Sequence, residues 1–241
     1  MNRIIKCGLL CATLVFFAAC NNNPDPSASQ AQKKLPFFGE FDVDVISLPD
    51  GSQRADTLYY PIPKFSFINQ DSAFITQSNY SGFITIVDFF FTECPTICPM
   101  MSAQMVRLQD KFKKENPELP IRFLSFSVKP ESDIPEKLRL YAERIGADLE
   151  HWNFLTGKPA DIYDLAQRGF LLTAFPSDTA QGGIFHTDKV TLLDRQLRIR
   201  GYYDGTSTAS MNSLYADAQF LTNEPTPQWK LQCAKTTRKP N

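Results

Sequence analysis

The sequence is short of several features that would place it in a specialised class. Its 25 basic and 26 acidic side chains leave a formal net charge of -1, without the basic excess expected of a nucleic-acid-binding protein. Only six of 241 residues are cysteine, far below the roughly 8–10% of a small disulfide-stapled protein. Apolar residues nevertheless make up 43%, enough to bury a sizeable core. We therefore expect one globular domain with tails and exclude wholesale disorder.

The longest apolar run lies at the N-terminus and is too short to span a bilayer as a helix. It covers Cys7–Ala19, 13 residues, and follows Arg3 and Lys6. A bilayer-spanning helix needs roughly 20 apolar residues, whereas the apolar region of a signal peptide has about 7–15. The run ends in Phe17–Cys20, which resembles a bacterial lipobox. We predict a signal peptide over residues 1–19 and lipidation of Cys20, with ordinary signal-peptide cleavage or an uncleaved anchor as alternatives.

Composition divides the rest of the chain into three parts. Residues 20–36 are mostly polar and without apolar periodicity, which predicts a flexible tether behind the lipidated cysteine. Residues 37–224 carry the apolar patterns of a folded domain, and the proline-containing, basic residues 225–241 are typical of a loose tail. The expected mature protein is an extracytoplasmic, membrane-anchored lipoprotein that faces the periplasm.

Strand-like and helix-like stretches alternate along the domain, although residues 37–80 give no clear pattern. The near-continuous apolar run at 82–91 predicts a central strand covered on both faces. The other expected strands are 121–128, 154–155 and a hairpin of 189–193 with 197–203; the expected helices are 99–115, 135–145 with Asp133 as its cap, 161–167 and 207–221. This order predicts an α/β fold with a mixed central sheet flanked by helices.

Two cysteines lie where the central strand meets its helix. Cys94 and Cys98 are four residues apart, which would place them on one helical face, with Pro95 at the first helical position. A helix N-terminus favours a thiolate, the form that binds metals and exchanges disulfides. Soft sulfur ligands select Cu(I) or Zn(II), and two of them with one imidazole would leave copper three-coordinate and accessible.

The chain has only two histidines to supply that imidazole. His186 follows Gly182 and Gly183 in a loop that precedes a predicted strand, and functional residues concentrate on such loops. His151 precedes Trp152 at a strand entrance, where a packed or solvated role is favoured. His186 is therefore the preferred candidate ligand.

Four motifs in order resemble those of the SCO/SenC family. They are residues 86–101 (IVDFFFTECPTICPMM), 127–135 (SVKPESDIP), 152–157 (WNFLTG), and 186–194 with 199–203 (HTDKVTLLD, IRGYY). The resemblance covers about residues 70–222. It implies a thioredoxin-like fold, copper held as Cu(I) or Cu(II) by Cys94, Cys98 and His186, and delivery of copper to the copper-site subunit of cytochrome oxidase or to another copper or thiol protein. Lys129 departs from the family, which commonly has aspartate there.

Two other functions remain open from the residues alone. In a thiol-disulfide oxidoreductase without metal delivery, Cys94 would attack a disulfide and Cys98 would resolve the mixed disulfide. In a zinc-bound or purely structural lipoprotein, the cysteine pair and His186 would be joined by His151 or Cys233 in a closed four-ligand site. His186 separates the first alternative from copper binding, because a reductase does not require it.

Overall fold

The structure is a computed structural model that describes residues 34–48, 50–177 and 184–224, with only the backbone for 184–186. The predictions for residues 1–19, Cys20, Cys233 and the C-terminal tail lie outside these residues. No helix among the described residues is both long and apolar enough to cross a bilayer.

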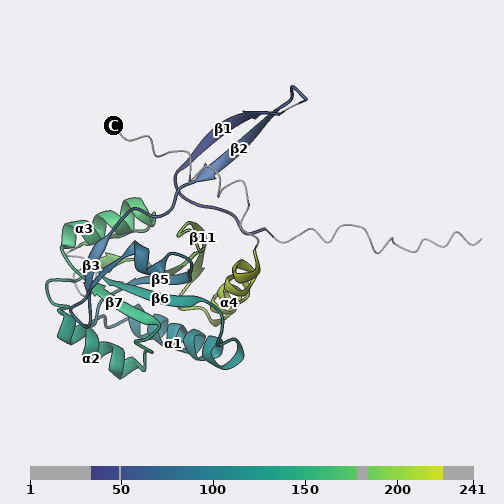
Figure 1. Cartoon of the computed structure of the whole chain (residues 1–241). Coiled ribbons are helices and arrows are strands. Elements are labelled where there is room, and N and C mark those ends of the chain that lie inside the picture. The colour runs from purple at the N-terminus through teal and green to yellow at the C-terminus, as the bar shows by residue number, and fades with distance from the viewer. Residues whose placement is uncertain (1–33, 49, 178–183, 225–241) are drawn as a thin grey trace, which may run out of the picture. The chain divides into compact units, whose positions relative to one another are not determined.

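Eleven strands and four α-helices make up the described part of the chain (Figure 1). The strands are β1 (Phe41–Ser47), β2 (Gln53–Tyr59), β3 (Ser66–Asn69), β4 (Phe74–Thr76), β5 (Ile84–Phe90), β6 (Ile121–Ser127), β7 (Trp152–Thr156), β8 (Ala174–Pro176), β9 (Ile184–His186), β10 (Lys189–Leu193) and β11 (Ile199–Asp204). The helices are α1 (Ile97–Glu115), α2 (Pro135–Ile145), α3 (Pro159–Asp164) and α4 (Thr208–Asn223), with a 3₁₀ turn at Gln77–Tyr80 and a π-helical turn at Leu165–Gly169.

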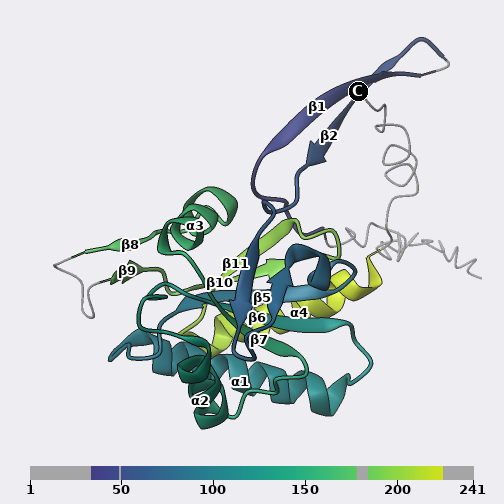
Figure 2. The ribbon, with the colours of Figure 1, turned by 60° about the vertical axis from the view of Figure 1, so that its left-hand side comes forward.

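Seven strands form the mixed central sheet that the alternation of elements predicts. Their order is β11-β10-β5-β6-β7-β3-β4. β5, β6 and β7 run parallel, whereas β10, β11, β3 and β4 each pair antiparallel with a neighbour. The views in Figures 1 and 2 place α1 and α2 on one side of the central strands and α3 on the other. The predicted α/β fold with a mixed sheet is confirmed.

The central strand β5 is buried along its whole length because helices cover both of its faces. Phe90 faces α2, where its ring centroid lies 5.0 Å from that of Tyr141. Phe89 points to the other face of the sheet, where its ring lies 5.2 Å from that of Phe126 on the neighbouring strand β6 and 5.3 Å from that of Phe170, which follows the π-helical turn. Burial on both faces explains why the sequence is apolar throughout this strand instead of alternating.

The apolar stripe expected on the helix after β5 is also present. Met101, Met105, Leu108 and Phe112 are all buried, with exposed fractions of 4% or less. Phe112 contacts Tyr215 of α4 with ring centroids 4.5 Å apart, so α4 packs beside α1. The stripe fixes α1 against the sheet, and its first turn lies at the carboxyl end of β5.

The prediction that Asp133 caps α2 is wrong. The residue at the cap position is Ile134, and no side chain caps the helix. The Asp133 carboxylate is instead 1% exposed and accepts hydrogen bonds from residues of β6 and of the loop after β5. Asp133 therefore binds Thr92 and Ser127, outside α2, instead of capping the helix that follows it.

Residues 37–80, which gave no clear pattern, contain the hairpin β1–β2 as well as β3 and β4. Every residue of β1 is exposed, so the strand packs no face against the core. Phe41, Val43 and Val45 alternate with acidic residues, which is a strand pattern without the burial that usually accompanies it.

Candidate functional site

Cys94 and Cys98 lie together at the carboxyl end of β5. Cys94 is in the loop after the strand and Cys98 is in the first turn of α1. Both are buried, with exposed fractions of 8% and 1%, and both carry thiols rather than a disulfide. The two side chains are hydrogen-bonded to each other. Two soft sulfur atoms are therefore close enough to bind one metal ion or to form one disulfide.

The geometry that holds the pair differs from the one expected. α1 begins at Ile97 with Thr96 as its cap residue, so Cys94 and Pro95 precede the helix. Cys94 lies in a turn in which its N–H donates to the Phe91 carbonyl oxygen at 3.3 Å. The prediction of one helical face for both cysteines, and of Pro95 at the first helical position, is wrong. The turn, rather than a helical repeat, brings the sulfur atoms together.

The environment of Cys98 favours its protonated form. The hydrogen bond with Cys94 and burial both raise the pKa of the Cys98 thiol, with a smaller contribution from the buried carboxylate of Asp88. Cys98 therefore remains a thiol at neutral pH until a metal or a disulfide takes the place of its proton. Cys94, with the larger exposed fraction, is the sulfur that an incoming reagent meets first.

Asp133 holds the loop that carries Cys94. Its carboxylate accepts the Thr92 N–H at 3.1 Å and the Thr92 hydroxyl at 2.6 Å, and it also accepts the Ser127 hydroxyl at 2.6 Å. Lys137 lies 3.6 Å from the same carboxylate and 2.9 Å from that of Glu93. The start of α2 is thereby tied to the two residues that precede Cys94, which fixes the loop against β6.

A cavity of about 460 Å³ opens beside the two thiols, between α1 and α2. Cys94 and Cys98 line it together with Tyr141 and Arg144 from α2. The remaining lining residues are Phe91, Thr92, Glu93, Pro99, Ser102, Ala103 and Ile145. The cysteine pair is therefore reached through a defined pocket.

The backbone places His186 at the same edge of the sheet as the cysteines. β10 pairs antiparallel with β5, with Thr191 opposite Val87, so the start of β10 lies beside the end of β5. A Cβ atom added to Gly205 would lie 3.0 Å from Met101 Cε and 3.1 Å from the Asp188 carbonyl oxygen. The first turn of α1 and the segment just after His186 therefore converge. The side chain of His186 lies outside what the structure describes, so its ligand role stays a prediction.

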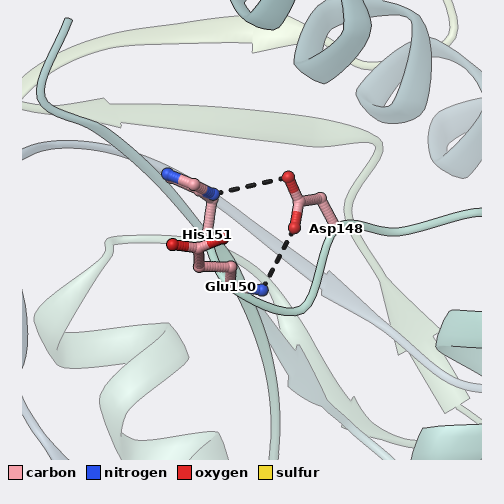
Figure 3. Close-up of side chains that lie close together, drawn as sticks. All are labelled: Asp148, Glu150 and His151. Atoms are coloured by element: carbon pink, nitrogen blue, oxygen red, sulfur yellow. Dashed lines mark hydrogen bonds and ion pairs between the residues drawn. The ribbon is translucent and has the colours of Figure 1, made fainter. Parts of the chain in front are cut away.

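His151 lies at the other end of the sheet. It precedes β7, which is parallel to β6, and its carbonyl oxygen accepts from Phe123 near the start of β6. Figure 3 shows its ring directed at Asp148, with Nδ1 3.4 Å from Oδ2. Ligand atoms of Asp148, Glu150 and His151 lie within 4.8 Å of one another, but Lys113 Nζ already pairs with Asp148 at 3.2 Å. His151 cannot complete a site with Cys94 and Cys98, so the closed zinc site that used it is wrong. The version with Cys233 lies outside the described residues.

Comparison with known proteins gives the family. The model of the SCO1/SenC family matches residues 55–218. The chain belongs to the SCO1/SenC family. The SCO1 protein homolog of Bacillus subtilis is 32% identical over 171 residues, which are 70% of this chain and 86% of that protein. The resemblance seen in the four sequence motifs is confirmed.

Solved structures support the same assignment. BsSco, described as a member of the Sco family of cytochrome c oxidase assembly proteins with a disulfide switch, matches with a TM-score of 0.62 and 30% identity, over 70% of this chain and 98% of that one. Copper-bound ScoI of Arabidopsis thaliana shares the fold, with a TM-score of 0.55 and 24% identity over 65% of this chain and 94% of that one. The predicted thioredoxin-like fold is confirmed.

Within this SCO1/SenC chain, residues 127–135 have a structural role that the motif alone does not reveal. Ser127 begins this motif and Asp133 lies near its end, and both belong to the hydrogen-bond network that fixes the loop before Cys94. In the sequence, Asp133 is seen only as an aspartate just before a helix, a position at which aspartate commonly caps the helix. Its actual partner, Thr92, is 41 residues away in sequence.

We expect Asp133→Ala to lower the free energy of unfolding by about 3 kcal/mol, because it leaves the Thr92 N–H and two hydroxyls without their buried acceptor. The measurement is urea denaturation followed by circular dichroism. Asp110→Ala, which removes an exposed carboxylate from α1, is the matched control and should change the value by less than about 0.5 kcal/mol. Equal stability of the two variants would show that Asp133 does not hold the loop.

Proposed function

We propose that this protein is a copper metallochaperone whose binding site is built from Cys94, Cys98 and His186. The observation that carries the proposal is the pair of adjacent thiols at the carboxyl end of β5, at the sheet edge where the backbone also brings His186. Two soft sulfur ligands with one imidazole suit copper and leave it open to transfer to another protein.

The donor set fits both oxidation states of copper. Thiolate sulfur is the preferred ligand of Cu(I), and an imidazole nitrogen supports Cu(II). The thiols must lose their protons to bind, so copper binding by the buried pair releases protons and becomes tighter as the pH rises. The copper-bound relative of the same fold supports this choice of metal.

A direct test of metal choice offers the reduced, anaerobically purified protein equal amounts of copper and zinc. We expect about one copper per chain and little zinc after gel filtration, measured by elemental analysis. The Cys94→Ser variant is the control for metal bound elsewhere on the chain. Preferential binding of zinc would favour the zinc-bound alternative over a chaperone for copper.

The same thiols support redox chemistry as a second role of the site. Their mutual hydrogen bond places the sulfur atoms in reach of each other, so the pair can pass between dithiol and disulfide. The disulfide switch described for BsSco supports this part of the proposal. A thiol-disulfide oxidoreductase without metal delivery is the competing function, and His186 separates the two.

The recipient that we propose is the copper-site subunit of cytochrome oxidase. The family description of BsSco as an oxidase assembly protein supports this choice. The test mixes the copper-loaded protein with the metal-free, purified copper-site domain of that subunit and follows the copper by elemental analysis after separation. We expect transfer to the oxidase domain, whereas retention of all copper by the chaperone would argue for another recipient.

Anchoring by a lipid on Cys20 would place this site at the periplasmic side of the membrane. Cys20→Ser is expected to release the protein from the membrane or to block its maturation, because the polar residues that follow offer no other anchor. Fractionation of cells that express each form, followed by immunoblotting, measures this. Full membrane retention of the variant would favour an uncleaved N-terminal helix.

A further inference from the structure

The cavity between α1 and α2 has the size of a small-molecule site. Ligand sites typically enclose about 300–1,000 Å³, and this one encloses about 460 Å³. It therefore has room for a small molecule or a short peptide. Cys94 and Cys98 both line it, so a reagent that enters the cavity meets the thiols directly.

Arg144 gives one side of the cavity a positive charge. Its side chain is exposed, its Nη2 donates to the Thr92 carbonyl oxygen at 3.3 Å, and its guanidinium carbon lies 5.0 Å from the centre of the Tyr141 ring. These contacts hold the guanidinium near the thiols without neutralising it. Its remaining donors can therefore bind an anionic group of a ligand.

The other charges around the cavity do not cancel that of Arg144. Among the described lining residues, Glu93 is the single carboxylate, and Lys137 pairs with it at 2.9 Å. Lys137 also lowers the pKa of the Glu93 carboxyl through this hydrogen bond, with a smaller contribution from Lys129. Asp133 and the buried Asp88 also act near the thiols, so three cations face three carboxylates in the wider surroundings. Neither aspartate lines the cavity, and because Lys137 pairs with Glu93, the charge that the cavity presents to a ligand is that of Arg144.

We propose that this cavity binds a small disulfide bearing carboxylate groups, with Arg144 pairing a carboxylate while the disulfide bond meets Cys94. The proposal rests on the proposed function because it uses the same thiols, and it names the class of molecule that oxidises them. The more exposed position of Cys94 makes it the attacking sulfur.

The exchange balances in two steps. The Cys94 sulfur forms a bond with one sulfur of the small disulfide, whose own S–S bond breaks, and the first half leaves with the Cys94 proton as a thiol. The Cys98 sulfur then bonds to Cys94, and the second half leaves with the Cys98 proton. Two electrons pass from the protein to the small molecule, leaving a Cys94–Cys98 disulfide and two small thiols. Because the sulfur atoms of Cys94 and Cys98 are no longer thiolates in the disulfide, the oxidised protein cannot bind copper through them.

The test compares three small disulfides of similar length on the reduced full chain: 3,3′-dithiodipropionate with two carboxylates, neutral bis(2-hydroxyethyl) disulfide, and cystamine with two ammonium groups. Acid quenching, alkylation and mass spectrometry of the peptide with Cys94 and Cys98 give each rate. We expect the dianion to react about five- to tenfold faster than the neutral compound, after correction for their rates with a free thiol, and the dication to react slowest.

Arg144→Gln should abolish that preference, whereas Arg144→Lys, which keeps the charge, should retain it within about twofold. Arg139→Gln is the matched control, because Arg139 lies on the same helix but pairs with Asp71 and does not line the cavity. A preference that is absent in the native chain, or unchanged by Arg144→Gln, would overturn the proposal.

Copper binding is measured on the same samples so that the two proposals fail separately. If the charge preference is absent while the cysteine pair binds copper, the disulfide site is wrong and the metallochaperone function stands. If the pair binds no copper while Arg144 governs the preference, the disulfide site stands and the oxidoreductase function takes the place of copper delivery.

Discussion

Replacing either Cys94 or Cys98 by serine is expected to weaken Cu(I) binding by more than about a hundredfold. Losing even an outer hydrogen-bonding partner of a metal ligand typically costs about 10–100-fold in affinity, and here a ligand itself is lost. One thiolate and one imidazole cannot match two thiolates in softness. A competition titration with a chromogenic Cu(I) chelator measures the change.

Cys233→Ser is the matched control for this experiment, because it removes a thiol from the C-terminal tail while leaving the cysteine pair intact. We expect its Cu(I) affinity and stoichiometry to equal those of the native chain. Serine is close to cysteine in size, so the hydrophobic packing around each position should be kept, and denaturation in urea checks this. Native Cu(I) affinity in a correctly folded Cys94→Ser or Cys98→Ser variant would end the assignment of the metal site.

The second large effect is expected from His186→Ala. The substitution removes the imidazole that supports Cu(II) and leaves both sulfur atoms able to exchange disulfides. We expect Cu(II) affinity to fall by more than about a hundredfold. Losing a residue that only hydrogen-bonds a metal ligand typically costs about 10–100-fold, and this variant loses a ligand itself. Visible absorption of the Cu(II)–thiolate complex follows the metal, and the rate with bis(2-hydroxyethyl) disulfide follows the thiols.

His151→Ala is the matched control for the histidine, because His151 lies at the opposite end of the sheet and pairs with Asp148. It should leave the Cu(II) absorption unchanged. If the absorption of the His186→Ala variant keeps its full intensity, His186 is not a ligand, and the oxidoreductase becomes the better account of the same cysteines.

The central part of the fold could be predicted because its signals are local and strong. The run that became β5 is apolar on both faces, and the stripe that begins at Met101 repeats at helical spacing. The two elements follow each other along the chain, so the junction between them, which holds both cysteines, could be located as well, although not its local geometry. The thioredoxin-like arrangement of the sheet was predicted from the resemblance of the four motifs to the SCO/SenC family.

The features that the sequence did not reveal depend on contacts between distant segments. Asp133 precedes a helix and matches the local rule for a cap, but its partner Thr92 belongs to another loop. The first cysteine lies outside α1 because the turn after β5 ends only at Thr96. The hairpin β1–β2 lacks a buried face, which is the signal on which strand prediction mainly depends.

The cavity beside the thiols could not be predicted at all from the sequence. Arg144 is 46 residues from Cys98 along the chain and resembles any exposed cation of an amphipathic helix. It becomes part of the site only because α2 packs beside α1 and carries Tyr141 and Arg144 to the same opening. Pocket chemistry of this kind follows from the packing angle between helices, which local patterns do not encode.

The most direct test of the copper site is a Cu(I) titration of one preparation in two redox states. Half is reduced, and in the other half Cys94 and Cys98 are joined as a disulfide, which mass spectrometry verifies. The account predicts about one tightly bound Cu(I) per reduced chain and none per oxidised chain, because metal binding and disulfide formation use the same two sulfur atoms. Equal Cu(I) binding by the two halves would contradict it.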